Sequence, residues 1–391
     1  MVEALPPTNV PRWDDGGRVL CVRLDALGDV LMTSPALHAL KESRPGCSLT
    51  LLTSSLGAAA APLLEPVDET IVYDPPWMKA TPQREGPDPD VAVLDRLRQG
   101  RFDGAVIFTV YSQNPLASAL LCHLAGIPRR LAHCRENPYQ LLTDWIAEPE
   151  PQRLIRHEAR RQLDLVGWIG CGTSDERLRI RVPEPAVARA KEALREWGAV
   201  EPGRDEWILI HPGASAPSRR WPPERFAEAA DRIHAETSLP ILFSGTSGEA
   251  ALVEQIAARM KAPSRSMAGK LSLAEFAAVV RASRLLISNN TSPVHIASAV
   301  GTPVIDLYAL TNPQHTPWMV PNRVLYHDVA CRWCYKSLCP QGHHDCLRKV
   351  EPESVVRAAH ELLAETRAAG YGISPVQDAG PHDPRAEEVT R

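Results

Sequence analysis

The chain has 391 residues, 44% of them hydrophobic, and a formal net charge of −4 at pH 7. A chain of this length predicts roughly two globular domains of about 150–200 residues each. The weak negative charge argues against a nucleic-acid partner. The sequence has neither an apolar signal core at its start nor an apolar run long enough to cross a bilayer, so we expect a cytoplasmic protein.

Strand-like and helix-like segments alternate in the first half of the chain. We predict them at 18–24, 30–42, 47–53, 70–73, 91–99 and 104–109. This alternation is typical of a parallel, doubly wound sheet. Residues 74–89 are rich in proline and charge, and we interpret them as a long functional loop.

The alternation stops at the proline-rich stretch 182–185, which we interpret as an interdomain linker, and then restarts. The predicted segments are 186–197, 207–210, 223–237, 240–243, 249–261, 273–281, 285–287, 294–300 and 304–308. We therefore predict an N-terminal domain (1–182) and a C-terminal domain (183–350). A last helix (351–367) is expected to pack back on the N-terminal domain, and the tail (368–391) to be disordered.

The turn Asn289–Pro293 lies between an apolar strand and a helix start. Its backbone N–H groups, its hydroxyls and the positive end of the helix favour an anion. The candidates here are Asn290, Thr291, Ser292 and His295. A lone histidine is more often structural, but His295 begins the helix beside this turn. A phosphate-bearing ligand is therefore our hypothesis for this turn.

Two further strand-to-helix loops carry donor-side candidates. In HPGASAPSRRWPPERF, Ser215 allows close backbone approach, and Arg219 and Arg220 suit phosphate oxygens; the alternative is a solvated basic turn. In LFSGTSGEAALVEQI, Glu249 is placed to accept from ribose hydroxyls, or simply stabilises a helix N-terminus. The donor-side candidates also include Gly245 and Thr246 in the same turn, and Gly269 further along the chain.

The first strand-to-helix turn, LDALGDV, lacks the GxGxxG pattern that places a dinucleotide there. It carries Gly28 and Asp29 at a helix start. Asp29 is either an ordinary helix cap or a carboxylate held at the ligand-binding edge of a parallel sheet. Asp25 adds a second carboxylate to the same turn.

The segment CRWCYKSLCPQGHHDC groups four cysteines, Cys331, Cys334, Cys339 and Cys346. A cytosolic group that begins with CxxC favours a structural tetrahedral metal site. Zinc is our leading choice, iron or an Fe–S cluster stays open, and His343 or His344 could replace one thiolate. Disulfides or free thiols are the alternative. The remaining cysteines are interpreted as reduced core thiols: Cys21, Cys47, Cys122, Cys134 and Cys171.

Four segments together resemble glycosyltransferase family 9, the ADP-heptose:lipopolysaccharide heptosyltransferase family. They are VRLDALGDVLMTSPALHALK, LIHPGASAPSRRWPPERF, the glycine turn after PILF, and ISNNTSPVHIASAVGTPVI. The resemblance implies a GT-B fold, in which two Rossmann-like lobes of parallel sheet enclose a cleft. The N-terminal lobe would bind the acceptor and the C-terminal lobe the nucleotide-sugar.

The resemblance also implies an inverting transfer without a catalytic metal, with Asp29 as general base. Asp25 and Gly28 then lie on the acceptor side. The chain departs from the family pattern at three places. Asp25 replaces a usual serine, Arg219 replaces a usual lysine, and Asn290-Thr291-Ser292 replaces Asp-Thr-Gly. A cysteine-rich segment near the C-terminal end also occurs in some relatives.

We therefore expect an enzyme that moves a heptose or related sugar from an ADP-activated donor to an envelope saccharide, a lipid-linked sugar or a protein. A lipid acceptor would bring the enzyme to the inner face of the membrane, and homo-oligomerisation is left open. Two other classes stay open: a GT-B-like nucleotide-sugar epimerase or hydrolase, and a non-catalytic binding or assembly module.

Overall fold

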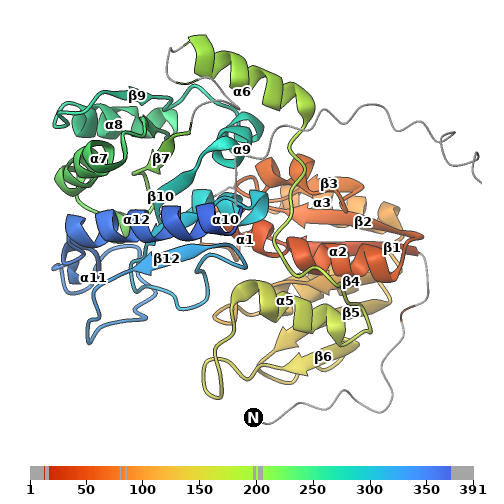
Figure 1. The fold of residues 1–391 in the computed structure, drawn as a ribbon. Coiled ribbons are helices and arrows are strands. Elements are labelled where there is room, and N and C mark those ends of the chain that lie inside the picture. Colours follow the sequence, from red (N-terminus) through yellow and green to blue (C-terminus); the bar gives the residue numbers. More distant parts are fainter. Residues whose placement is uncertain are drawn as a thin grey trace, which may run out of the picture.

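Two parallel six-stranded sheets form the frame of the molecule (Figure 1). The computed structural model describes residues 13, 17–79, 81–83, 86–196, 200 and 206–370. The N-terminal sheet contains β1 (Gly17–Arg23), β2 (Cys47–Thr53), β3 (Glu69–Val72), β4 (Gly104–Ile107), β5 (Arg129–Cys134) and β6 (Asp144–Ala147). The C-terminal sheet contains β7 (Ile208–His211), β8 (Ile241–Phe243), β9 (Ser264–Ser266), β10 (Leu285–Asn289), β11 (Val304–Leu307) and β12 (Asn322–Leu325).

Helices connect the strands of each sheet. The N-terminal lobe has α1 (Leu27–Met32), α2 (Ser34–Ser43), η1 (Ala58–Leu63), α3 (Asp88–Gly100), α4 (Leu116–Leu124) and α5 (Glu158–Gly167). The C-terminal lobe has α6 (Glu184–Glu196), η2 (Pro217–Arg219), α7 (Pro223–Thr237), η3 (Ser247–Glu249), α8 (Ala250–Ala257), α9 (Leu273–Ala282), α10 (Ser292–Val300), α11 (Asp345–Arg348) and α12 (Pro352–Ala368). Both lobes are therefore α/β units, as the alternation of the sequence predicts.

The strand order explains where ligands can bind. The orders are β3-β2-β1-β4-β5-β6 and β12-β11-β10-β7-β8-β9. Each order reverses direction once, between β1 and β4 in the first sheet and between β7 and β10 in the second. In open parallel sheets the crevice beyond the carboxyl ends of the strands at this reversal is the ligand site. The central strand β1 is buried through its apolar residues, because helices cover both faces of such a sheet.

The last helix is a correction to the sequence analysis. We expected residues 351–367 to pack on the N-terminal domain, but α12 packs against α7 and beside β11 and β12 of the C-terminal sheet. Its apolar face, which includes Val355, Leu362 and Leu363, joins the core that the C-terminal strands build. An amphipathic pattern specifies that a helix has a buried face, but it does not specify the surface that covers this face.

Other boundaries differ in smaller ways. The expected loop 74–89 is shorter, because α3 already begins at Asp88. The sequence analysis missed β5, β6 and β12; β5 reads RRLAHC and lacks an apolar run. The tail beyond residue 370 lies outside the described residues. The five scattered cysteines are buried, as expected for core residues.

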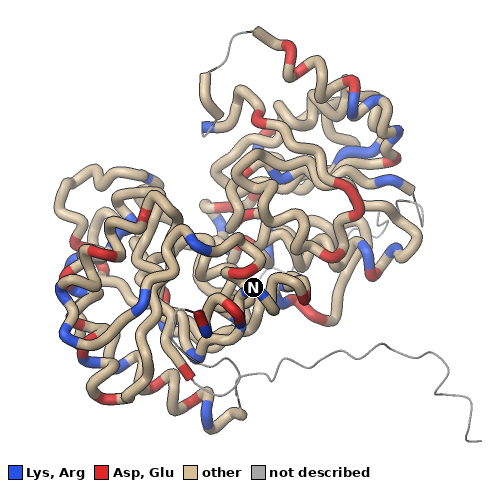
Figure 2. Tube along the Cα trace, turned by 90° about the horizontal axis from the view of Figure 1, so that it is seen from above, with Lys and Arg blue, Asp and Glu red and all other residues tan. Residues whose placement is uncertain are grey.

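Acidic and basic residues are interspersed over both lobes (Figure 2). Within the described ranges, no helix combines the length and the apolar character that crossing a membrane would require.

Candidate active site

The two lobes meet where α1 packs against α10. α1 follows β1 and α10 follows β10, so each helix begins at the reversal point of its own sheet. The approach is close at Gly28, where an added Cβ would lie 2.8 Å from Cδ2 of His295 and 3.7 Å from Oγ of Ser292. Only a residue without a side chain fits between these two helices. The contact brings Asp29, in the first turn of α1, to the N-terminus of α10.

A cavity of about 260 Å³ lies beside this helix contact and takes its walls from both lobes. The predicted site residues that line it are Gly28, Asp29, Ser215, Arg219, Asn290, Thr291, Ser292 and His295. Thr291 is the N-cap of α10 but makes no side-chain cap hydrogen bond, which leaves the helix end available to an anion.

A second cavity, of about 510 Å³, continues from the first within the C-terminal lobe. The predicted residues that line it are Ser215, Gly245, Thr246, Glu249, Gly269, Thr291 and Ser292. Ser215, Thr291 and Ser292 line both cavities. Phe276 and Met267 make part of its wall apolar. A smaller cavity thus adjoins a larger one whose wall is partly apolar.

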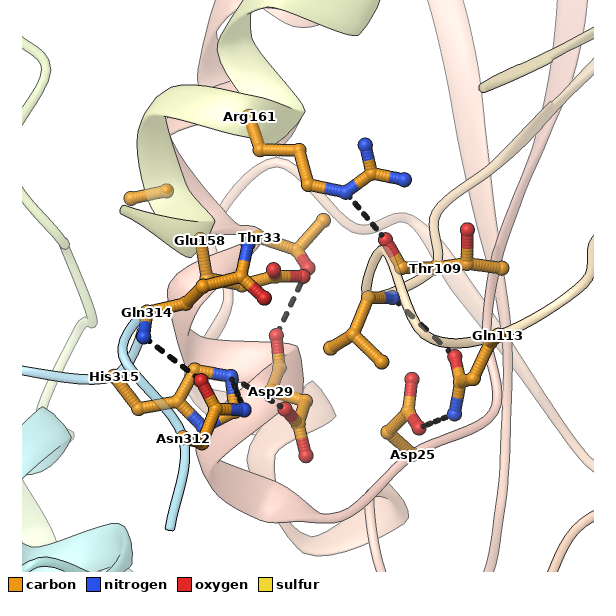
Figure 3. A network of polar contacts seen from close by, with 12 residues as sticks. Asp25, Asp29, Thr33, Thr109, Gln113, Glu158, Arg161, Asn312, Gln314 and His315 are labelled. Atoms are coloured by element: carbon orange, nitrogen blue, oxygen red, sulfur yellow. Dashed lines mark hydrogen bonds and ion pairs between the residues drawn. The ribbon is translucent and has the colours of Figure 1, made fainter. Parts of the chain in front are cut away.

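Asp29 belongs to a buried charge cluster centred on Arg23 (Figure 3 shows the three carboxylates). The Arg23 side chain is 0% exposed and reaches Asp25 at 3.0 Å, Asp29 at 3.3 Å and Glu158 at 2.8 Å. Burial disfavours the charge of Arg23, yet the three carboxylates raise its pKa above the ordinary value. The sequence analysis did not single out Arg23, although a lone arginine inside an apolar strand was visible.

The same cluster adjusts the basicity of Asp29. Burial raises the pKa of Asp29 above its ordinary value, and Arg23 works in the opposite direction. Glu158 raises the pKa of Asp29 further through like-charge repulsion. A carboxylate with a raised pKa is a better proton acceptor than an ordinary one.

His315 approaches Asp29 from the other lobe. Its Nε2 lies 3.8 Å from Oδ1 of Asp29, and it lines the first cavity. Figure 3 shows the ring facing the Asp29 side chain. Burial lowers the pKa of His315 to about 4, so the ring is neutral at pH 7. Nothing in the sequence pattern separated this loop histidine from others.

Asp25 lines neither the first nor the second cavity. It lines a third cavity, in the N-terminal lobe, with Gln113. The Gln113 amide donates to Oδ1 of Asp25 at 2.5 Å, on the opposite side of the cluster from His315 (Figure 3). Burial raises the pKa of Asp25 to about 6.

The two adjacent arginines separate. Arg219 lines the first cavity; burial lowers its pKa and Asp29 counteracts this. Arg220 instead donates from Nε to the Ala214 carbonyl at 2.8 Å and lines a different cavity beside Trp221. The structure therefore brings Arg219, but not Arg220, to the site with the other candidates.

Glu249 has a structural partner as well as a place in the second cavity. It closes a capping box with Thr246, whose backbone N–H and hydroxyl donate to Oε2 at 2.8 and 2.9 Å. The carboxylate also packs directly over Gly213, where a Cβ would lie only 1.9 Å from Oε1. Both interpretations of Glu249 from the sequence thus remain compatible with its position.

Asn290 stands where the family resemblance leads us to expect an aspartate. Its side chain forms hydrogen bonds with neighbouring groups of the protein. Its amide donates to Asp306 at 2.9 Å and to the His315 carbonyl at 2.8 Å. Burial raises the pKa of Asp306 well above its ordinary value. A carboxyl group is therefore present beside the turn, on β11. His295 is buried, which lowers its pKa well below the ordinary value, so it is neutral at pH 7.

The cysteine segment forms a wall of the first cavity. Tyr335, Lys336 and Ser337, between the second and third cysteines, line it. The backbone carbonyl of Lys336 accepts from the Ser218 hydroxyl at 2.9 Å, which ties the segment to the Arg219 loop. Tyr335 also meets Tyr111 of the other lobe, with ring centroids 5.9 Å apart. The sequence analysis considered only possible metal ligands in this segment, so it missed Lys336.

The cysteines themselves are free and partly buried. Burial, and to a smaller extent the thiols of Cys339, Cys331 and Cys334, raise the pKa of Cys346. Cys331 Sγ lies 3.7 Å from Nε2 of His343. In the described part of the chain, however, no three His, Cys, Asp or Glu side chains are arranged to hold a metal ion. Metal ligands often converge only when the ion binds.

Residues 91–344, well over half of the chain, match glycosyltransferase family 9 (heptosyltransferase). The chain belongs to glycosyltransferase family 9. It is similar to lipopolysaccharide heptosyltransferase 2 of Salmonella typhimurium, with 26% identity over 279 residues, covering 69% of this chain and 78% of the relative. This family 9 protein is accordingly a glycosyltransferase.

Solved structures share the fold of this glycosyltransferase. A family 9 glycosyltransferase of Veillonella parvula superposes with a TM-score of 0.76 at 23% identity, over 91% of this chain and 99% of that one. The ADP-heptose lipopolysaccharide heptosyltransferase II of Escherichia coli gives a TM-score of 0.69 at 20% identity, over 90% and 99%. The two-lobed GT-B fold expected from the sequence is confirmed.

Proposed function

We propose that this glycosyltransferase moves a heptose or a related sugar from an ADP-activated donor to a hydroxyl group of an envelope saccharide, lipid-linked sugar or protein, with inversion. The similar proteins of Salmonella typhimurium and Escherichia coli are named for lipopolysaccharide and, in the second case, for ADP-heptose. A cytoplasmic location at the inner membrane face and homo-oligomerisation stay predictions.

One observation carries the proposal. The Asp29 carboxylate, on the N-terminal lobe, shares a cavity with Arg219 and the N-terminus of α10 on the C-terminal lobe. A proton acceptor and an anion-binding end then face each other across the gap between lobes. This is the arrangement that transfer from a nucleotide-sugar to a hydroxyl group requires.

The chemistry follows from these positions. Asp29 would take the proton of the acceptor hydroxyl as its oxygen bonds to the anomeric carbon of the donor. The bond between that carbon and the diphosphate oxygen breaks, and ADP leaves with the electron pair. Attack opposite to the leaving group inverts the anomeric centre.

The leaving diphosphate needs positive partners because no catalytic metal is proposed. Arg219, Lys336 and the end of α10 all border the cavity. Charged donors in a partly buried site are worth more than in water, since there is little solvent to screen them. The base and ribose would occupy the second cavity, where Glu249, Gly245 and Gly269 line the wall.

Two measurements test the function. ADP should raise the melting temperature of the protein, because its diphosphate and nucleoside would occupy the two cavities, and GDP and UDP serve as the comparison for the base. No stabilisation by any of the three contradicts the proposal. Asp29→Asn should lower kcat by about 10²–10⁴-fold and keep ADP binding. Asp95→Asn, an exposed aspartate of the same lobe, is the matched control. Rapid donor turnover without an acceptor would instead favour the epimerase or hydrolase alternative.

We also propose that Cys331, Cys334, Cys339 and Cys346 bind a structural metal ion, zinc or iron. The donor set suits the proposal, because thiolates are soft ligands for either metal and the four cysteines lie within one short segment of the chain. A bound ion would hold the cysteine segment, and with it Lys336, in place against the cavity.

A further inference from the structure

The third cavity lies outside both donor cavities. It has a volume of about 520 Å³ and sits at the carboxyl ends of β1 and β4, the reversal point of the N-terminal sheet. Its walls include Asp25, Trp77, Phe108, Gln113 and Asn114. Neither Asp29 nor any residue of the C-terminal lobe lines it. It is therefore a ligand site that belongs to the N-terminal lobe alone.

We propose that this cavity binds the acceptor as an uncharged pyranose sugar, stacked on Trp77 and hydrogen-bonded by Asp25, and that it rejects anionic sugars. The inference rests on the proposed transferase function and adds the chemical class of the acceptor. The argument comes from the charge, the aromatic wall and the polar contacts of the cavity.

The charge of the cavity excludes anions. Its lining residues within the described ranges include no Lys, Arg or His, and Asp25 is the charged residue among them. Asn114, also in the wall, donates to Glu136, which adds a second carboxylate near the cavity. Arg23 contacts Asp25, but its guanidinium is shared among three carboxylates. A sugar carboxylate or phosphate would thus meet like charge and, in the lining, only neutral hydrogen-bond donors.

The aromatic wall suits the apolar face of a sugar ring. Trp77 remains 38% exposed although it borders a cavity. Tyr73 holds it from the edge, with ring centroids 5.9 Å apart and planes at 67°. An indole ring that is fixed at its edge but open to solvent gains by covering its face with an apolar surface. The C–H face of a pyranose provides such a surface.

The polar contacts leave Asp25 able to accept from a hydroxyl group. Gln113 is itself fixed, because its Oε1 accepts from the Val110 N–H at 3.3 Å while its amide donates to Asp25 at 2.5 Å. Nε of Arg23 forms an ion pair with the other carboxylate oxygen, Oδ2 of Asp25, at 3.0 Å. A carboxylate accepts about four hydrogen bonds. The remaining capacity of Asp25 is oriented by two rigid partners, which favours recognition of a hydroxyl group at one position.

The cavity is also connected to the chemistry. Asp25 and Asp29 bind the same guanidinium of Arg23, so the acceptor cavity and the base are separated by one buried side chain. A sugar bound by Asp25 would therefore lie beside the charge cluster that holds Asp29. The departure from the usual family serine at position 25 thus has a specific role, which is to select the acceptor.

Saturation-transfer NMR tests the inference with a matched pair of ligands, methyl α-D-glucopyranoside and its uronic acid, which differ by one carboxylate. We expect the neutral glycoside to bind about tenfold more tightly or better. Trp77→Ala should lower the affinity for the neutral glycoside by about tenfold. Asp25→Asn should reduce the difference in affinity between the neutral glycoside and the uronic acid. Tyr139 is an aromatic residue that is 82% exposed and lies outside the cavity, so Tyr139→Ala should leave the affinity for both ligands unchanged.

Equal binding of the two ligands, no binding of either, or an unchanged affinity in Trp77→Ala overturns the inference. ADP binding, measured on the same samples, separates this result from failure of the proposed function. A protein that binds ADP but not the neutral glycoside refutes only the acceptor class. A protein that does not bind ADP refutes the transferase proposal itself.

Discussion

Asp29 and His315 face each other from different lobes, with Oδ1 and Nε2 3.8 Å apart. Because burial lowers the pKa of His315 to about 4, the ring is neutral at pH 7 and does not draw a proton away from the acceptor. The carboxylate thus lies between a neutral ring and the Arg23 guanidinium. This arrangement fixes its direction without adding a second positive charge.

His315 is therefore predicted to position Asp29. His315→Ala should lower kcat by about 10–100-fold through misplacement of the base, with little change in ADP affinity. His315→Gln, whose amide still offers one N–H donor and one acceptor atom, should restore part of the rate. His360→Ala, an exposed histidine on α12, is the control. A parallel loss of ADP binding in His315→Ala would indicate a donor-side role instead.

The acid limb of the pH–rate profile should report Asp29. Its pKa is raised above the ordinary value of about 3.9, so kcat/KM should fall as pH drops through that raised pKa, where the carboxylate gains a proton. Glu158 contributes to the raised pKa by repulsion. Glu158→Gln should therefore move the limb to lower pH. An unmoved limb would show that another group is being titrated.

Arg23 should be essential to the stability of the N-terminal lobe. Arg23→Met would leave the fully buried Glu158 carboxylate and its two neighbours without their shared cation, at a cost of about 3–5 kcal/mol. Arg18→Met, on the same strand, removes an ion pair that is about half exposed and a cation–π contact with Phe102, and should cost about 1 kcal/mol. Calorimetric melting of both variants makes the comparison. Similar melting temperatures would contradict the central place given to Arg23.

Lys336 should assist departure of the diphosphate. Lys336→Ala removes a cation from the wall of the first cavity, and we expect kcat to fall by about 10²-fold. The loss should diminish for Lys336→Arg. Lys349→Ala removes an exposed lysine that pairs with Asp345 and should leave kcat unchanged.

Metal content should depend on the cysteine segment. Elemental analysis of the purified protein should find zinc or iron, and a Cys339→Ser/Cys346→Ser double variant should lose it. Transfer should fall with the metal, because Lys336 lies within the same segment. Cys47→Ala alters a buried thiol of the N-terminal lobe and should retain the metal. Metal-free wild-type protein with full activity would refute the proposed site.

The sequence predicted the parts of the site that follow strands. Asp29, Ser215 and Thr291 each come after a central strand, and parallel strands bring their carboxyl ends to one edge. Local pattern and topology were enough to bring these residues together. The same reasoning separated the chain into two alternating units.

The parts that it missed come from contacts between distant segments. His315 lies in an irregular loop, and only the docking of the lobes brings it to Asp29. Arg23 is visible in the sequence as a charge in an apolar strand, but its partner Glu158 is 135 residues away. For α12, periodicity marked a buried face without marking its partner.

The stretch after β11 ties the C-terminal lobe to the N-terminal one. The Gln314 carbonyl accepts from the Glu158 N–H at 3.1 Å, and Trp318 stacks on His157 with centroids 4.4 Å apart. Residues of the donor-side chain thus help to hold the helix that carries Glu158. Exchanging a whole lobe with that of a relative would replace one side of both contacts, so we expect such chimaeras to lose stability at this interface between the lobes.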